Sequence, residues 1–278
     1  MEISAKVVNE LRHKTGAGMM DCKKALVETG GDFDKAIEVL RKKGQKVAES
    51  RVGRDANEGS IIVKSSADNT AAAIIEINCE TDFVARNADF QTLGNEIAAL
   101  AEANRPANLE ALKALAMGDG RTVSEHLTDI IGKIGEKIDV REYALLTGDS
   151  VVTYIHPGAR VGVVVAFSGA EGDVAAAGRD VAMQITAMKP IAIDKDGVST
   201  DIVQKEIEIG MDLARQEGKP ETMLEKIAQG KLQKFYKENT LLNQEFVKDG
   251  SKTIAQYIKE NLGASATVVG FHRFELGA

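Results

Sequence analysis

The chain has 278 residues, more than a typical single domain, so two or three compact units are expected. Hydrophobic residues make up 44% and charged residues 28%, and no apolar run approaches the roughly 20 residues that span a bilayer, which argues against a membrane protein. The formal net charge of −7 argues against broad nucleic-acid binding, because neutralising phosphates requires a surplus of lysine and arginine.

The amino-terminal segment, residues 1–54, predicts a small head of three helices. Its start, Met1–Lys6, lacks the basic, apolar and cleavage regions of a secretory signal, so we expect a cytoplasmic protein. Helical patterns are separated at Thr15–Gly18 and Gly30–Gly31, and Asp32 is a suitable cap for the third helix. The head holds 12 Lys+Arg against 8 Asp+Glu, a balance of +4 that leaves −11 for the remainder. This asymmetry fits attraction to an acidic protein surface and, equally, an ordinary solvated helical face.

Two features of the head bear on function. We expect one of Met19 and Met20 in the head's core and the other available to a partner, because the flexible thioether suits adaptable contact surfaces. The Gly16-x-Gly18 spacing lacks the later glycine and the preceding strand of a dinucleotide site, so nucleotide binding is not predicted. From Gly44 to Gly59 large apolar residues are scarce, which predicts a polar linker after the head.

Beyond this linker the sequence predicts an internal duplication. Three pairs of segments align, at offsets of 90, 84 and 131 residues: Ser60–Ile62 with Ser150–Val152, Gly94–Ala98 with Gly178–Ala182, and Val140–Leu145 with Phe271–Leu276. Each copy has the pattern of a β-hairpin, a helix, a later helix and a closing strand. We therefore predict an α+β fold with two subdomains, each a three-stranded antiparallel sheet covered by helices, in residues 55–146 and in residues 147–198 with 240–278.

The two copies differ in the segments that separate the aligned blocks. The first has six extra residues between its hairpin and its helix, within Cys79–Leu93. The second has 47 extra residues before Lys252, and apolar stripes on both sides of Gly218–Pro220 predict an antiparallel helical hairpin in residues 199–239. A dimer contact, a projecting arm and a decorative insertion are all compatible with this hairpin. Segments present in only one copy are the better candidates for a specific function, because packing alone explains the shared parts.

The longer loop of the first copy places an acidic residue, Asp82, directly before a large aromatic residue, Phe83. On one interpretation, Phe83 fills the core of its own subdomain and Asp82 caps the helix that runs toward Phe90. On the other, Phe83 is exposed as an interface anchor, and the neighbouring carboxylate disturbs a partner's cation or its water ligands.

Chemistry carried out by the chain itself is not predicted. No Gly-x-Ser-x-Gly elbow occurs, and Cys22 and Cys79 lie outside any Cys-x-x-Cys pair, which favours two reduced thiols over a disulfide or a zinc site. No metal site or cofactor site is recognisable among the four histidines, which lack the i, i+4 spacing of a helical zinc pair: His13, His126, His156 and His272.

Two long motifs resemble those of the elongation factor Ts family and occur in the same order. They are LRxxTGAGMMDCKKAL in Leu11–Leu26 and NCETDFVAR in Asn78–Arg86. Further similarity covers nearly the whole chain, through Lys133–Glu136, Gly158–Val163, Gly218–Pro220, Glu245–Val247 and Gly270–Glu275. The resemblance implies a ubiquitin-associated-like three-helix head, a duplicated core and a coiled-coil hairpin.

The resemblance also implies a partner, the GTPase elongation factor Tu, for which this chain would be the guanine nucleotide exchange factor. Residues of the head and a loop of the first copy would contact the partner's nucleotide-binding domain, and an acidic–aromatic pair would intrude beside its magnesium ion. The matching positions are Arg12, Met19, Met20, Ile134, Gly135 and His156 for partner binding, and Thr81, Asp82, Phe83 and Val84 for dislocation of the magnesium ion.

Two departures from the family pattern weaken the expected contact. Pro157 enlarges the turn after His156, and the sequence stops at Ala278 without the further helix that some members use. The resemblance leaves open whether the helical hairpin forms a homodimer or a 2:2 complex or touches the partner. A second hypothesis is a scaffold or chaperone-like binder that uses the head alone; the Asp82–Phe83 loop discriminates between the two.

Overall fold

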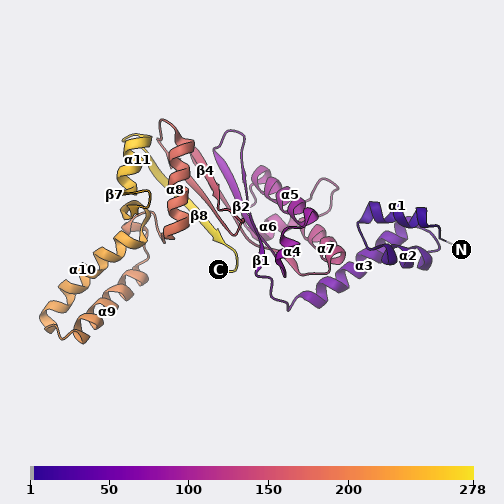
Figure 1. The fold of residues 1–278 in the computed structure, drawn as a ribbon, viewed down its shortest axis with the longest axis horizontal. Helices are drawn as coiled ribbons and strands as arrows, with labels where there is room; N and C mark the ends of the chain where they lie inside the picture. Colours follow the sequence, from indigo (N-terminus) through magenta and orange to yellow (C-terminus); the bar gives the residue numbers. More distant parts are fainter. Residues whose placement is uncertain (1–2) are drawn as a thin grey trace. The chain divides into compact units, whose positions relative to one another are not determined.

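The computed structural model describes residues 3–278 and confirms a mixed α+β fold built from helices and small antiparallel sheets. The chain divides into two compact units. The first unit comprises the residues up to Lys64, Ala73–Ala144 and Phe274–Ala278, and the second comprises Ser65–Ala72 and Leu145–Arg273. Figure 1 labels helices and strands of both units.

The first unit begins with three helices: α1 (Ala5–Thr15), α2 (Met19–Glu28) and α3 (Phe33–Arg51). The carboxylate of Asp32 accepts a hydrogen bond from the backbone N–H of Lys35 and caps α3, as the sequence predicts. Their core is small and apolar, and it includes Leu11, Cys22 and Leu26, all fully buried. We call these three helices the head.

Helix α3 extends well beyond the head, so the prediction of a polar linker starting at Gly44 is wrong. The helix continues to Arg51 and packs against α7 (Val123–Ile134), as Figure 1 shows. Gly44 lies within α3, at the point where this helix meets Gly132 of α7. A tertiary contact therefore overrides the low helix propensity of glycine, which costs only about 1 kcal/mol relative to alanine.

The first sheet has the strand order β1-β2-β3, formed by β1 (Glu58–Ser65), β2 (Ala71–Cys79) and β3 (Ile138–Thr147). The central strand β2 is buried at every position. Four helices separate β2 from β3: α4 (Asp82–Ala85), α5 (Ala88–Asn104), α6 (Leu109–Ala114) and α7. Phe90 of α5 is fully buried and supplies the largest side chain of this core.

The second sheet has the strand order β4-β5-β8, formed by β4 (Ser150–Ile155), β5 (Val161–Ser168) and β8 (Thr267–Glu275). Strands β4 and β5 pair antiparallel in a register that runs from Ser150↔Phe167 to Ile155↔Gly162. Helices α8 (Val174–Met188) and α11 (Ile254–Leu262) pack with this sheet in one apolar core. A two-stranded ribbon, β6 (Glu245–Phe246) and β7 (Asp249–Thr253), precedes α11.

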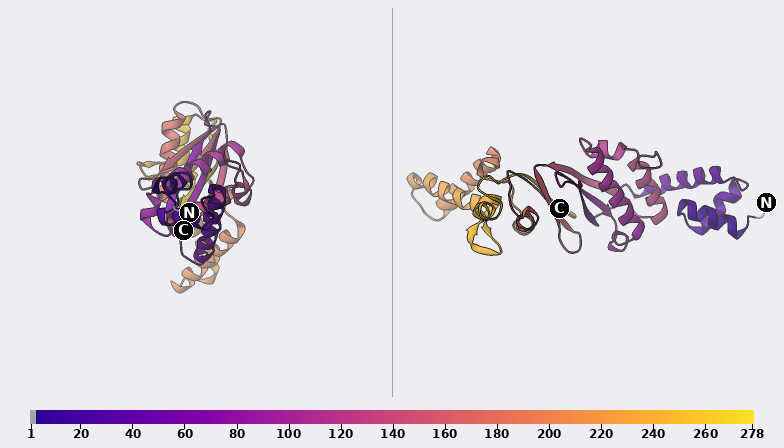
Figure 2. Two further views of the ribbon diagram at one scale, coloured as in Figure 1. Left: turned by 90° about the vertical axis from the view of Figure 1, so that its right-hand side faces the viewer. Right: turned by 90° about the horizontal axis from the view of Figure 1, so that it is seen from above.

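The second unit also contains the predicted helical hairpin, formed by α9 (Thr200–Gln216) and α10 (Glu221–Asn239). Its seam consists of small and branched apolar residues: Gly210 of α9 faces Ala228 of α10, and Ala214, Leu224 and Leu232 are also buried. Figure 2 shows the pair lying clear of the β4-β5-β8 sheet. At its base, the buried Gln184 and Gln244 side chains hydrogen-bond to each other at 3.1 Å and to backbone groups, which fixes where α10 ends.

Candidate functional site

The short helix α4 carries the exposed aromatic residue of the first unit. Phe83 is 79% exposed, an unusual state for a phenylalanine. The interpretation in which Phe83 fills its own core is therefore wrong, since Phe90 occupies that core. Asp82 does not cap the helix toward Phe90 either: Thr81 caps α4 by accepting a hydrogen bond from Val84 N–H, and Asn87 caps α5.

The turn Thr81–Val84 is held from both sides by carboxylates that the sequence did not single out. Glu136 accepts two hydrogen bonds from Thr81, one from its backbone N–H at 3.0 Å and one from its hydroxyl at 2.8 Å. Glu80 accepts the backbone N–H of Lys137 at 2.7 Å and both of its oxygens accept from the Arg51 guanidinium, at 3.2 and 3.0 Å. Hydrogen bonds to ionised carboxylates are among the stronger ones in proteins, so the turn is preorganised.

Within this turn the four residues have different environments. Val84 is buried and packs α4 against the core, while the hydroxyl of Thr81 donates a hydrogen bond to Glu136. Asp82 and Phe83 are the two that point outward. The carboxylate of Asp82 is paired with the guanidinium of Arg86 one helical turn later, so its charge is locally balanced.

The loop after α7 lies beside this turn. Ile134 ends the helix, and Gly135 caps it with a backbone φ of +86°, a left-handed conformation that glycine adopts without strain. The next residue, Glu136, makes the two hydrogen bonds to Thr81. The structure thus brings together two segments that the sequence places about 50 residues apart, and the partly exposed Ile134 and Gly135 flank the Phe83 turn.

The head offers a second apolar surface. Met19 and Met20 are 54% and 63% exposed, so the expectation that one of them is buried in the head's core is wrong. That core is filled by other residues, Leu11, Cys22 and Leu26 among them. Arg12 is also exposed, and its carbonyl accepts the N–H of Gly16, which ends α1 just before Met19.

His156 belongs to the second unit, in the turn between β4 and β5. Its Nδ1 lies 3.1 Å from the hydroxyl of Tyr154, and the two rings make an edge contact. His156 is therefore oriented by its own strand, as a turn residue would be.

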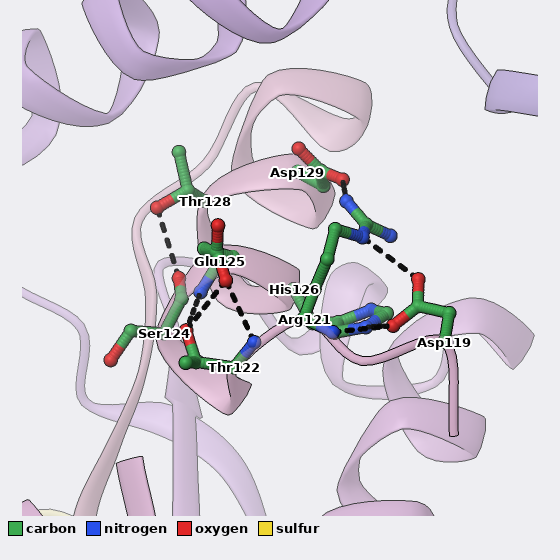
Figure 3. Close-up of polar contacts among 8 residues, drawn as sticks. All are labelled: Asp119, Arg121, Thr122, Ser124, Glu125, His126, Thr128 and Asp129. Carbon is green, nitrogen blue, oxygen red and sulfur yellow. Dashed lines mark hydrogen bonds and ion pairs between the residues drawn. The ribbon is translucent and has the colours of Figure 1, made fainter. Parts of the chain in front are cut away.

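A polar network sets the position of α7 in the first unit (Figure 3). The guanidinium of Arg121 bonds to Asp119 at 2.8 Å and to Asp129, while His126 Nε2 lies 2.9 Å from Asp119. The hydrogen bond from His126, and then those from Arg121, hold the pKa of Asp119 well below its ordinary value. Next to this network, Thr122 and Glu125 cap the start of α7 reciprocally.

The buried thiol of Cys79 directly precedes the Phe83 turn. Burial, and next the negative charge of Glu136, raise its pKa to about 12, so it is a poor nucleophile. Cys22 is also free and buried. Across residues 3–278, no group of three or more His, Cys, Asp or Glu side chains is placed to hold a metal ion. None of the helices in this part of the chain is long and apolar enough to cross a membrane.

Comparisons with known proteins identify relatives over the full length. The family model described as elongation factor TS matches residues 80–278. The elongation factor Ts of Amoebophilus asiaticus is 53% identical over 100% of both chains, and that of Cytophaga hutchinsonii is 53% identical over 99% of both. The elongation factor Ts of Porphyromonas gingivalis is 49% identical, again over 100% of both chains.

Proposed function

Because this chain belongs to the elongation factor Ts family, it is a guanine nucleotide exchange factor for elongation factor Tu, and we propose that its Thr81–Val84 turn drives the exchange. In this proposal Asp82 and Phe83 enter the magnesium and phosphate site of the GDP-bound partner. Thr81 and Val84 hold the turn in place. The partner's hold on the nucleotide is weakened without any covalent step in this protein.

The observation that carries the proposal is the exposure of Phe83 on a turn whose backbone is already fixed. An exposed aromatic side chain on a rigid segment is the usual form of an interface anchor, since little conformational entropy is lost when it is buried by a partner. The hydrogen bonds from Thr81 to Glu136 supply that rigidity. A scaffold that used only the head would not need such a turn, so the scaffold hypothesis is not favoured.

The energy required is modest. If the bound factor weakens GDP affinity by some ratio, GDP must weaken the affinity for the factor by the same ratio. A hundredfold weakening corresponds to about 2.7 kcal/mol, within the range of a single buried aromatic anchor. The same reciprocity releases the factor when GTP binds, so the complex is transient.

We propose supporting roles for the other surfaces. Arg12, Met19 and Met20 bind the partner's nucleotide-binding domain, and Ile134 and Gly135 press on the same domain beside the turn. His156 contacts a different domain of the partner. The exposure of the two methionines and the hydrogen bonds that join the Ile134–Glu136 loop to Thr81 support these roles.

We also propose a domain organisation that these roles require. Residues 1–54 form a ubiquitin-associated-like head, and the core consists of duplicated subdomains in 55–146 and in 147–198 with 240–278. The insertion 199–239 is a coiled coil, open to a homodimer, a 2:2 complex or contact with the partner. The recurring order of two strands, helices and a closing strand supports the duplication. We propose further that the protein acts in the cytoplasm and does not bind nucleic acid directly.

The proposal is tested by measuring release of fluorescent GDP from purified elongation factor Tu. The chain should accelerate release, and Phe83→Ala should remove most of the acceleration while leaving thermal stability unchanged, since the side chain is exposed. Val269→Ala is the control, because Val269 is also an exposed apolar residue, at 50%, but belongs to β8 of the second unit. Equal release with and without the chain would refute the proposal, and full activity of Phe83→Ala would refute the role of the turn.

A further inference from the structure

The head and the Phe83 turn are joined by a close crossing of two helices. A Cβ atom added to Gly132 of α7 would lie 2.6 Å from the Cα of Gly44 of α3, a distance that real Cβ atoms do not reach. The crossing is asymmetric. A Cβ added to Gly44 would lie 3.6 Å from Gly132 Cα and from the Thr128 carbonyl oxygen, which is ordinary van der Waals contact. Only position 132 therefore requires glycine for this helix separation.

Lys133, the residue after Gly132 in α7, contacts both the head and α5, the helix that follows the Phe83 turn. A Cβ added to Gly16 of the head would lie 2.7 Å from Lys133 Cε and Nζ, so the lysine stem runs across this backbone. The ammonium group ends 2.7 Å from the carboxylate of Asp89, near the start of α5. Gly16 precedes Met19 by three residues, and Asp89 follows Phe83 by six. One side chain thus links the segments that carry the two proposed contact surfaces.

Beside this crossing the head is not fully packed against the rest of the unit. A hollow of about 290 Å³ lies between them, and its lining includes Thr15, Ala17 and Gly44 from the head and Gly132 and Lys133 from α7. The position of α1 and α2 relative to α7 therefore depends on the contacts around this hollow, those of Gly132 and Lys133 among them. Farther along, Arg51 of α3 reaches the Glu80 carboxylate directly before the turn.

From these contacts we propose that Gly132 and Lys133 are positioning residues, which hold Met19 and Met20 at a fixed distance from Phe83 so that one partner meets both surfaces at once. This inference rests on the proposed function. Two surfaces on one rigid body bind a partner with a single loss of rotational and translational freedom. If the head moves freely, its surface must bind in a second step, and the more freely it moves, the lower its effective concentration near the partner. Gly132 and Lys133 touch no nucleotide and no reacting atom.

The proposal predicts that substitutions of Gly132 or Lys133 weaken the affinity for the partner but leave the maximal rate of GDP release unchanged. With Gly132→Ala, the concentration of factor that gives half-maximal GDP release should rise about tenfold, as expected when one of two linked surfaces loses its preorganisation. The maximal release rate should stay within about twofold of the wild-type rate, because Phe83 and its turn are intact. Phe83→Ala should show the reverse pattern, a lower maximal rate.

Gly44→Ala is the matched control. Both substitutions replace a helical glycine by alanine and gain the same helix propensity, about 1 kcal/mol, so a difference between them reports the crossing. Gly44→Ala should keep the wild-type half-maximal concentration. Lys133→Glu removes the ion pair with Asp89 and should raise that concentration about threefold, within the range of a partly exposed pair. Adding Asp89→Lys should restore it.

A measurement that needs no partner separates this inference from the function. Spin labels at Val27→Cys on α2 and Glu96→Cys on α5 sit at exposed positions, while Cys22 and Cys79 are buried. The distance distribution between the labels should be narrow in the wild-type and Gly44→Ala backgrounds and broadened or shifted with Gly132→Ala. Identical narrow distributions in all three, or an unchanged half-maximal concentration for Gly132→Ala, would overturn the inference. Failure of the proposed function would instead appear as no acceleration by the wild-type chain.

Discussion

Both sheet-containing regions begin with two strands and end with a third, with helices between them, and each has segments that the other lacks. The β1-β2-β3 region adds the short helix α4, which exposes Phe83, whereas the β4-β5-β8 region adds the α9–α10 hairpin, which buries its apolar seam. In the second region the loop from β5 to α8 is also held by a carboxylate, since Asp149 accepts hydrogen bonds from Ser168 and Gly169. Both loops are thus fixed, but only one presents an aromatic side chain. The proposed function depends on this exposed aromatic side chain.

The largest expected effect on GDP release comes from removing the carboxylate that holds the Phe83 turn, compared with removing the carboxylate that holds the β5–α8 loop. Glu136→Ala removes both hydrogen bonds to Thr81 and should slow factor-stimulated GDP release about tenfold, the ~1.4 kcal/mol cost of ordering the turn on binding. Asp149→Ala removes two equivalent hydrogen bonds and should leave release unchanged. The comparison breaks if both variants, measured in the same nucleotide-release assay, lose activity equally.

The next effect concerns the hairpin. A Cβ at Gly210 would lie 3.1 Å from Ala228 Cα and 3.2 Å from its Cβ, so Gly210→Leu overpacks the seam and should cost about 1–3 kcal/mol of unfolding free energy. We expect the maximal rate of GDP release to stay the same. Urea unfolding combined with the release assay checks both. A loss of maximal rate with unchanged stability would assign the hairpin a direct part in exchange.

A smaller effect is expected on the chemical reactivity of Cys79, which tests whether Glu136 holds the turn in place. With a pKa of about 12, the Cys79 thiol is ionised in only about one molecule in 10⁴ at pH 8, so it should react with thiol reagents almost only after local opening. Glu136→Ala removes a negative charge and loosens the turn, and both changes should speed modification of Cys79. Mass-spectrometric labelling from pH 7 to 9 measures the rate, with Asp149→Ala as control. Equal rates in both variants would show that Glu136 does not hold the turn closed.

The smallest expected effect is a shared response to acid. The pKa of Asp119 is lowered by hydrogen bonds from His126 and Arg121, and the pKa of Asp149 is lowered by those from Ser168 and Gly169. Because each is lower in the folded chain, each stabilises the fold above the ordinary carboxyl pKa of about 3.9 and loses this contribution as the pH falls below it.

Both groups are exposed to solvent, so the change in each region should be small. Asp119→Asn and Asp149→Asn should flatten the fall in melting temperature between pH 5 and 3 in calorimetry. A steeper fall in either variant would contradict the lowered pKa of that residue.

The sequence predicted the elements well and their mutual contacts poorly. Capping residues and apolar periodicity located the head helices, both sheets and the α9–α10 hairpin, because these signals are local. The extension of α3 through Gly44 was missed, since it depends on Gly132, 88 residues later. Local sequence periodicity carries no information about a contact between two such distant glycines.

The candidate site shows the same division. The motif around Asp82 and Phe83 was found, and the choice between its two interpretations required the structure, because burial of a phenylalanine depends on which aromatic residue fills the core. The carboxylate of Glu136 bonds to a residue 55 positions away, and that of Glu80 bonds to Arg51, 29 positions away. Glu80 and Glu136 lie within the segments that resemble the family, but acidic residues are common on any surface, and nothing local indicates their distant partners.

The Asp82–Arg86 pair has a consequence for approach to a nucleotide site. A bare carboxylate at the tip of the turn would be repelled by the phosphates of GDP at a distance of several ångströms. With the guanidinium alongside, the tip is electrically neutral and presents a dipole, whose field falls off faster than that of a single charge. In the proposed function, the turn can then come near a polyanion without a long-range barrier.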